Sequence, residues 1–300
     1  MPSVPPPLTR PAPASRGRAG ATADELPPWK PWLAPAGIAL GLALGSLGGI
    51  VVSLVGAAGG ASLSHPPPAV NNASNVALDI GFVAEAIYLA SLSGAVRLTD
   101  FGFRRAALWR SLGIVALAAF CYFGTTQVYS IVLGLHGREQ LPKGLGSTSD
   151  TAAMVAVGVF VTVIAPICEE FFFRGFLFGV LRSWLAPRGS WGTWAAAIVT
   201  GILFGCAHIG SAALKYLVPL AFLGFVLCIV RWRTGSLYPG MALHSINNSL
   251  AFGISELHWD TAKIISMGLL ALGAIAAIAG PLGAREPAVA AAAPATPGRT

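Results

Sequence analysis

The chain has 300 residues, of which 55% are hydrophobic and only 10% are charged, and its mean hydropathy is +0.70. Soluble globular proteins carry about 25% charged residues, so this composition excludes an ordinary water-soluble protein. It indicates an integral membrane protein, in which apolar runs of about 20 residues cross the bilayer as helices. We therefore predict an all-α, polytopic fold with its active site inside the helical bundle.

The apolar runs predict about eight transmembrane helices within one membrane domain over residues 31–284. Their expected ranges are 33–55, 76–96, 111–135, 152–181, 194–209, 217–230, 237–254 and 264–282. Residues 1–30, rich in Pro, Ala and Arg, and the Ala/Pro-rich residues 285–300 are expected to be disordered tails. The first apolar run begins too late and is too long for a cleavable signal peptide.

The distribution of basic residues predicts the orientation of these spans. If the N-terminus is cytoplasmic, only four of the 19 lysine and arginine residues, Arg138, Lys143, Lys215 and Lys263, lie on the opposite side, and Arg174 lies inside a span. Basic residues that flank spans tend to stay in the cytoplasm, so both termini are predicted to be cytoplasmic. The net charge of +7 is thereby explained as a topology signal, and no nucleic-acid partner is predicted. The Ala, Gly and Arg-rich composition is typical of a high-GC bacterial genome and favours a bacterial inner membrane.

The fourth apolar run contains three charged residues, Glu169, Glu170 and Arg174, in the stretch ICEEFFFRGF. Ionisable groups at membrane depth are costly unless they are paired or face a cavity, so each is a candidate functional residue. Glu170 and Arg174 are four residues apart with the acid first, a spacing that allows them to pair on one helix face. Glu169 is rotated by about 100° from Glu170 and must find another partner or water. One acid is therefore expected to anchor the helix and its neighbour to act as a base. Pro166, one turn earlier, is expected to kink this span.

Two further apolar runs carry polar residues at helical spacing. Phe204 and His208 are four residues apart in FGCAH, and His244 and Asn248 are four residues apart in HSINN. At ~1.5 Å per residue, Glu169, His208, Asn248 and His244 fall at similar depths, which allows them to share one layer. Each residue alone has an ordinary structural explanation, namely an interhelical hydrogen bond or a salt bridge. Together, on three separate spans, they predict one shared site.

The remaining intramembrane polar residues are harder to assign from the sequence. Asp79 and Glu85 in the second run have no evident partner. Glu85 either lines the same cavity or makes a structural hydrogen bond to another helix, and the hydrogen bond is favoured. The four cysteines lie in apolar runs without paired spacing, so we expect small packing residues rather than disulfides.

The ordered set of motifs resembles a known family. Glu169, Glu170 and Arg174 as E-E-x-x-x-R, Phe204 and His208 as F-x-x-x-H, and His244 and Asn248 as H-x-x-x-N are similar to the motifs of the CAAX protease and bacteriocin-processing family. These intramembrane proteases are also called type II CAAX endopeptidases or Abi proteins. The resemblance covers residues 166–249.

The resemblance implies peptide-bond hydrolysis within the membrane, on a membrane-associated or lipidated peptide. It assigns Glu169 as the general base acting with His208 on water, and His244 and Asn248 as stabilisers of the oxyanion. Glu170 and Arg174, with Phe204 nearby, would support the site. A zinc ion held by Glu169, His208 and His244 is an alternative, since two histidines and a carboxylate are a plausible zinc set. Cys168 and Cys206 are less favoured as metal ligands than as packing residues.

Two other functional classes remain open. The same residues would suit the proton relay of an ion-coupled transporter, although the sequence shows no repeated halves. A non-catalytic membrane scaffold or immunity protein would keep the motifs for structure alone. Zincin-like, rhomboid-like and presenilin-like proteases are excluded because the sequence contains no H-E-x-x-H, G-x-S-G or G-x-G-D motif.

Overall fold

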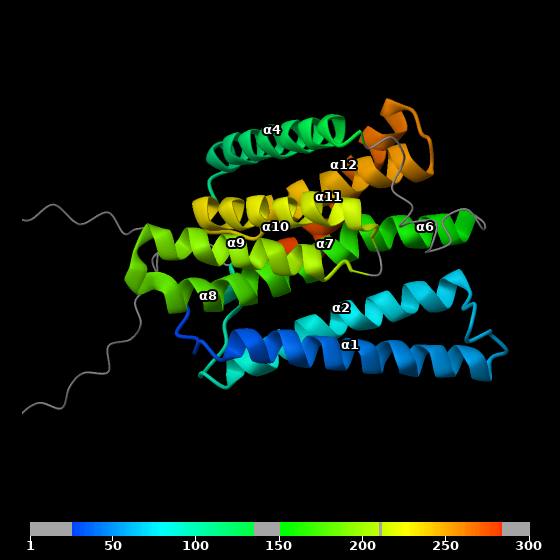
Figure 1. The fold of residues 1–300 in the computed structure, drawn as a ribbon, viewed down its shortest axis with the longest axis horizontal. Coiled ribbons are helices and arrows are strands. Elements are labelled where there is room, and N and C mark those ends of the chain that lie inside the picture. Colours follow the sequence, from blue (N-terminus) through cyan, green and yellow to red (C-terminus); the bar gives the residue numbers. More distant parts are fainter. Residues whose placement is uncertain (1–25, 135–150, 210–211, 284–300) are drawn as a thin grey trace, which may run out of the picture.

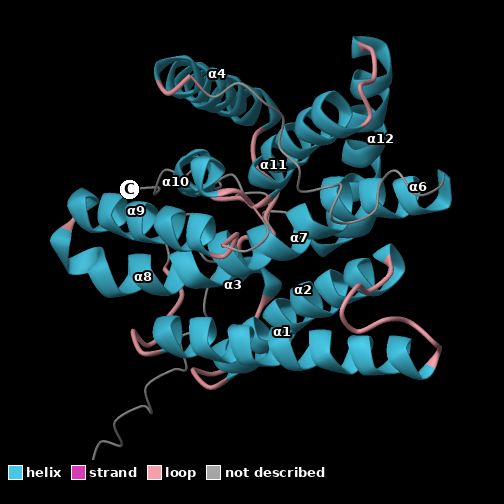
Figure 2. Ribbon diagram, turned by 45° about the vertical axis from the view of Figure 1, so that its right-hand side comes forward, coloured by secondary structure: helices cyan, strands magenta, loops and turns pink. Residues whose placement is uncertain are grey.

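All regular secondary structure in the described part of the chain is helical. The structure, a computed structural model, describes residues 26–134, 151–209 and 212–283. Within these ranges it contains no strand, and an isolated bridge joins Ile209 and Ala212 (Figure 2). The all-α class expected from composition is confirmed.

The helices follow the predicted apolar runs, with one long composite helix at the centre of the chain. The first four are α1 (Leu33–Ala58), α2 (Pro68–Ser91), the short α3 (Leu98–Phe101) and α4 (Leu108–Val132). The composite helix covers Thr151–Arg188. Its parts are α6 (Thr151–Val159), the π-helix η1 (Phe160–Ile164), α7 (Ala165–Glu169), the π-helix η2 (Glu170–Leu177), α8 (Phe178–Leu185) and the 3-10 turn η3 (Ala186–Arg188). The last are α9 (Ser190–Cys206), α10 (Leu214–Thr234), α11 (Tyr238–Ala251), the π-helix η4 (Phe252–Glu256), α12 (Thr261–Ala279) and the 3-10 turn η5 (Gly280–Leu282).

Six of these elements are long and apolar enough to cross a membrane. They are α1, α2, α4, the composite helix, α10 and α12. The predicted count of eight is not confirmed, because α9 has 17 residues and α11 has 14. The polar residues of the H-x-x-x-N motif also lower the hydropathy of α11. The chain is an integral, multi-pass membrane protein.

The helices are arranged in layers around the composite helix (Figure 1). The antiparallel hairpin of α1 and α2 lies on one side of it, and α4 and α12 lie on the opposite side. Between them, α9, α10 and α11 pack beside the composite helix. Buried aromatic side chains gather on both sides of that helix, among them Phe101, Phe171, Phe172 and Phe176 towards Trp29, α2 and α3, and Phe204 on α9. Large apolar side chains on the outer faces are exposed, as expected for helices that contact lipid.

The segment before α1 is partly packed onto the bundle. Trp29 is buried and its ring lies 4.9 Å from that of Phe101 and 5.6 Å from that of Phe176. The rest of the tail expected to be disordered, residues 1–25, and the C-terminal tail from residue 285 lie outside the described residues.

Glycines allow α9 and α10 to approach until their backbones touch. A Cβ atom at Gly201 of α9 would stand 2.7 Å from the carbonyl oxygen of Ala221 and 2.7 Å from the amide nitrogen of Phe225. From the other helix, a Cβ at Gly224 would stand 2.8 Å from the Cβ of Phe204. Small residues at helix contacts are the common way to gain van der Waals packing between membrane helices. This contact fixes where Phe204 lies relative to α10.

We expect Gly201→Ala to lower the free energy of unfolding by about 1–3 kcal/mol, because the new methyl group meets backbone atoms that cannot move away. Gly113→Ala in α4 is the matched control, since a Cβ there meets nothing within 4 Å. That control should leave stability within about 1 kcal/mol of the parent, on the stabilising side. Thermal unfolding of both variants in detergent measures the difference. Equal effects of the two substitutions would contradict a close contact of α9 with α10.

Candidate active site

A buried ion pair stands at the centre of the composite helix. The Arg174 Nη1 atom lies 2.8 Å from Glu170 Oε1, and neither side chain is exposed. The same guanidinium donates through Nη2 to the carbonyl oxygen of Gly224 in α10 at 3.2 Å. Its Cζ atom lies 4.2 Å from the centre of the Phe204 ring in α9, a cation–π contact. The pairing expected from the spacing is present, and Arg174 also connects three helices.

His244 of α11 lies between the two adjacent acids. Its Nδ1 atom is 3.1 Å from Glu170 Oε1, and its Nε2 atom is 3.7 Å from Glu169 Oε2. An ionised carboxylate only accepts hydrogen bonds, so Nδ1 donates to Glu170 and Nε2 is directed towards Glu169. Gly240, one turn earlier, permits this approach, because a Cβ there would stand 2.8 Å from Glu170 Oε2. The two acids thus differ in environment: Glu170 is fully buried and ion-paired, whereas Glu169 is 19% exposed.

Phe204 and His208 extend this cluster from α9. The Phe204 ring is fully buried, with its centre 5.7 Å from that of His244 and 4.9 Å from that of His208. His208 was expected within a helix, but α9 ends at Cys206 and His208 lies in the following turn. Its Nδ1 atom is 2.8 Å from the Phe204 carbonyl oxygen. If Nδ1 donates this bond, the neutral ring carries its lone pair on Nε2, as in histidines that act as bases or ligands.

Asn248 and Ser245 of α11 hold the composite helix at its proline. Pro166 has no N–H group, and such a group would reach the carbonyl of Thr162 in α-helical register or that of Val161 in π-helical register. Both carbonyls accept from α11 instead. Ser245 Oγ donates to Thr162 O at 2.7 Å, and Asn248 Nδ2 donates to Val161 O at 2.7 Å. One N–H of Asn248 therefore has a structural task.

The π-helical segments lie next to the motif residues. η1 ends two residues before Pro166, and η2 begins at Glu170 and includes Arg174. A π-helical turn is rare and is found mainly at functional sites, where it changes the direction of side chains along the helix. Here the segments flank α7, which carries Glu169.

Two acids of α2 are buried in the bundle, and some of their oxygens have no hydrogen-bond partner among the described residues. Asp79 is 5% exposed, its Oδ2 atom has no hydrogen-bond partner, and its charge interacts with that of Glu169. Glu85 is 2% exposed, and neither of its carboxyl oxygens has a partner among the described residues. The structural hydrogen bond favoured for Glu85 is therefore absent there. Asp79 belongs to the surroundings of Glu169, which the sequence did not indicate.

The expected zinc ligands do not form a preformed metal site in this arrangement. Among the described residues, no three His, Cys, Asp or Glu side chains come together as a metal-binding group. The donor set Glu169, His208 and His244 thus does not fit zinc as it stands, and no step below is routed through a metal.

All four cysteines are unpaired, in agreement with the absence of disulfide spacing. The expected packing role applies to the buried Cys228. It is wrong for Cys121 and Cys206, which are exposed because they lie on outward faces of α4 and α9.

Direct contacts bring together five of the seven expected residues, and the other two are attached to the edge of the cluster. The five are Glu169, Glu170, Arg174, Phe204 and His244. His208 is connected through Phe204, and Asn248 is connected through the backbone of η1. Sequence reasoning missed Ser245 and Gly240. The serine could have been found from its place three residues before Asn248, on the same helix face.

Comparison with known proteins agrees with this geometry. Residues 151–250 match the family model for Rce1-like proteins, described as type II CAAX prenyl endopeptidases. This confirms the family resemblance over the third of the chain that carries all three motifs, and it indicates a protease of the membrane.

One curated protein is similar to part of this chain, and its description names no function. An uncharacterized 24.3 kDa protein of Escherichia coli is 34% identical over 84 residues, which are 28% of this chain and 37% of that protein. The match thus spans little more than a third of the relative. No solved structure matches the chain.

We expect Ser245→Ala to lower the free energy of unfolding by about 0.5–1.5 kcal/mol, because Thr162 loses a donor in a dry environment. Ser249→Ala is the matched control on the same helix. Ser249 is also buried, but its Oγ atom has no hydrogen-bond partner, so its loss should be neutral or slightly stabilising.

A double-mutant cycle tests the link with the proline. In a Pro166→Ala background the new N–H group can satisfy the carbonyl, so Ser245→Ala should cost less than in the parent. Thermal unfolding in detergent measures all four proteins. An unchanged cost in the Pro166→Ala background would contradict the link.

Proposed function

We propose that this protein is an intramembrane endopeptidase that hydrolyses a peptide bond with a water molecule activated by Glu169. The observation that supports this most strongly is that the two adjacent acids differ in their ion pairing and in their exposure. Glu170 is neutralised by Arg174 and bonded to His244, whereas no lysine or arginine among the described residues pairs with Glu169, which retains partial exposure. A carboxylate in that position can take a proton from water.

The proposed reaction begins with proton transfer from water to Glu169. The resulting hydroxide attacks the carbonyl carbon of the substrate, and the carbonyl oxygen takes the negative charge of the tetrahedral intermediate. Glu169 then gives its proton to the amide nitrogen as the carbon–nitrogen bond breaks. The products are a carboxylic acid and an amine. His208, with its Nδ1 atom placed by the Phe204 carbonyl, assists Glu169 in orienting the water.

His244 and Asn248 are the proposed stabilisers of the oxyanion. Asn248 has two N–H groups and uses one on Val161, so one remains for substrate. The bond of Asn248 to η1 then has a second purpose, because a donor fixed in advance stabilises developing charge most strongly. His244 is held in the same way by Glu170, and because Nδ1 is used in that bond, stabilising the oxyanion from Nε2 requires the doubly protonated ring. Glu170, Arg174 and Phe204 act through these residues as positioning groups.

The proposed substrate is a membrane-associated or lipidated peptide, which diffuses to the site within the bilayer. The proposed location is a bacterial inner membrane with both termini in the cytoplasm, as the basic residues indicate. Hydrolysis by Glu169 requires no cofactor, and an essential zinc ion is the competing proposal.

We expect Glu169→Gln to reduce kcat for cleavage of a membrane peptide by about 10²–10⁴-fold, because the amide cannot accept a proton. Glu85→Gln is the matched control: it makes the same substitution at another buried acid of the bundle, one that lies outside the proposed machinery. It should leave kcat unchanged. Cleavage by purified protein in proteoliposomes, with thermal unfolding as a check on folding, measures both variants.

The same assay separates the alternatives. Unchanged cleavage in Glu169→Gln would remove the base assignment. Proton-driven uptake by the parent that is lost in Glu169→Gln, without any cleavage, would favour an ion-coupled transporter. Wild-type protein without either activity would favour a membrane scaffold or immunity protein. Loss of cleavage after chelation, restored by added zinc, would favour the metal-dependent form.

A further inference from the structure

One face of α2 carries polar side chains from the first turn of the helix to its middle. Asn72, Asn75 and Asp79 stand at positions i, i+3 and i+7, a spacing that places them on one side of a helix over about 10 Å. Asn72 and Asn75 are half-buried and Asp79 is buried. This polar face of α2 therefore leads inward from the end of the bundle where α1 turns into α2 and where α6 begins (Figure 1).

The contacts of α2 show where its polar face points. On the side of α2 that packs against α1, a Cβ at Gly48 would stand 3.3 Å from the Cβ of Ala77. At about 100° per residue, Ala77 points almost opposite to the polar face. Phe82, three residues after Asp79, lies with its ring centre 4.6 Å from that of Phe172 in η2. The polar face is therefore turned away from α1 and towards the composite helix.

Asp79, at the inner end of this face, lies near Glu169. α2 packs against α7, which carries Glu169, and the charges of both acids act on the Cys168 thiol and on each other. Asp79 is 5% exposed, and its Oδ2 atom has no hydrogen-bond partner among the described residues. The same is true of Glu169 Oε2. Each acid thus has a buried oxygen that lacks a donor, and one water molecule can donate a hydrogen to each.

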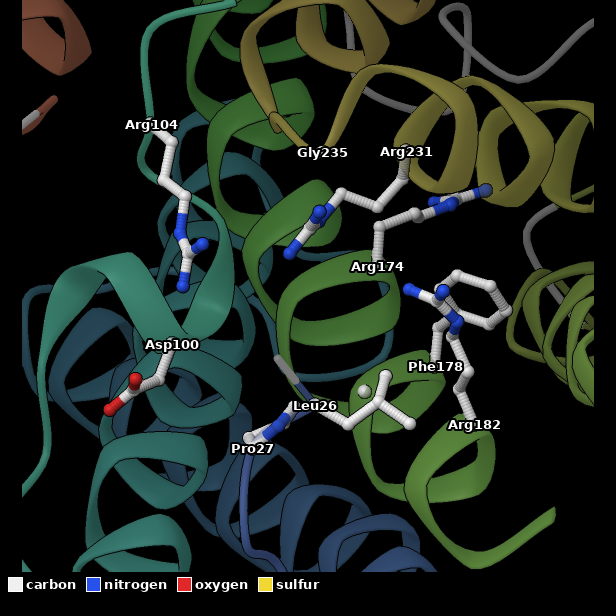
Figure 3. A pocket seen from close by; sticks show the side chains of 10 residues that line it. Leu26, Pro27, Asp100, Arg104, Arg174, Phe178, Arg182, Arg231 and Gly235 are labelled. Atoms are coloured by element: carbon white, nitrogen blue, oxygen red, sulfur yellow. The ribbon is translucent and has the colours of Figure 1, made fainter. Parts of the chain in front are cut away.

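A pocket near the opposite end of the bundle is separated from Glu169 by a buried ion pair. Figure 3 shows the side chains that line this pocket, among them Arg174, Arg182 and Arg231. Arg174 also belongs to the candidate site, through its ion pair with Glu170. Neither side chain of that pair is exposed, so water entering from this pocket would have to pass the ion pair. The polar face of α2 offers the more open approach to Glu169.

We propose that the polar face of α2 is the route by which water enters the bundle, and that Asp79 holds the water molecule that Glu169 deprotonates. The water donates one hydrogen to each acid. The hydrogen on the side of Glu169 is transferred to it as a proton, and the other stays on the hydroxide that attacks the substrate carbonyl. Asp79 is then a further catalytic residue. Its role rests on the proposed function, whereas the route does not.

Thiol reactivity in proteoliposomes tests the route and needs no peptidase activity. In a protein whose four native cysteines are replaced by alanine, Asn75→Cys places a single thiol on the polar face, and Asn72→Cys is the second variant if Asn75→Cys does not fold. Ile80→Cys is the matched control, because Ile80 is 59% exposed on the outer side of the same helix. Silver ions are no larger than water and are excluded from lipid, so they should block Asn75→Cys at least about tenfold faster than Ile80→Cys. Mass spectrometry of the thiols left free measures both rates, and equal rates would overturn the route.

Cleavage kinetics in the same proteoliposomes test the role of Asp79. Asp79→Leu should lower kcat for a membrane peptide roughly tenfold or more and change KM by less than about twofold, because the water loses an acceptor while substrate contacts stay. Asp79→Asn keeps an oxygen that accepts a hydrogen bond, so it should recover most of kcat. Glu85→Leu is the matched control at another buried acid of α2, and it should leave kcat unchanged. Thermal unfolding in detergent checks the folding of all three variants.

Three kinetic results would overturn the role of Asp79. An unchanged kcat in Asp79→Leu would show that the water does not need this residue. Equal losses in Asp79→Leu and Asp79→Asn would show that an oxygen acceptor at this position is not sufficient. A parent protein that cleaves no peptide would remove the proposed function and the role of Asp79 with it, whereas the thiol rates would still decide on the route.

Discussion

The organisation of this bundle depends on the cost of placing charge where water is scarce. An unpaired arginine inside the bundle would be costly, and Arg174 avoids this cost through its ion pair with Glu170. The remaining donors of the guanidinium and its cationic face then require partners, and these come from α10 and α9 as the Gly224 carbonyl and the Phe204 ring. His244 adds α11 through the same Glu170. One ion pair thereby determines how four helical elements meet.

The separation of roles between Glu169 and Glu170 is a consequence of that arrangement. Adjacent residues on a helix point in directions about 100° apart, so only one of them can face Arg174. The other acid is left beside the Nε2 atom of His244 at 3.7 Å, too long for a hydrogen bond and suited to change when a substrate arrives. Asp79 of α2 adds a further negative charge to the environment of Glu169. Reactivity and anchoring are thus assigned by geometry to two residues of the same type.

Much of this could be predicted from the sequence, because membrane-embedded charges and four-residue spacing are strong constraints. The apolar runs and the pairing of Glu170 with Arg174 follow from composition and periodicity, and the spacing on three spans predicted a site shared by Glu169 and His244; the bond of His244 to Glu170 was not predicted. The position of His208 could not be predicted, because α9 ends one turn early and apolar residues continue past its end. Neither could the donation of Asn248 and Ser245 to η1, because the π-helical register that places those carbonyls depends on packing. The count of eight crossings is not confirmed, because α9 and α11 are shorter than the other predicted spans.

The π-helical segment η2 has a consequence for how such chains can change in length. A π turn contains one residue more than the α turn it replaces, so removing one residue between 170 and 177 would return the helix to regular α geometry. Because the extra residue is accommodated within the turn, the helix after it keeps nearly the same direction relative to Glu169 when that residue is removed. Related chains that differ by a single residue in this stretch would therefore still present the same face of α8 to α9, and only the side chains within the stretch would shift.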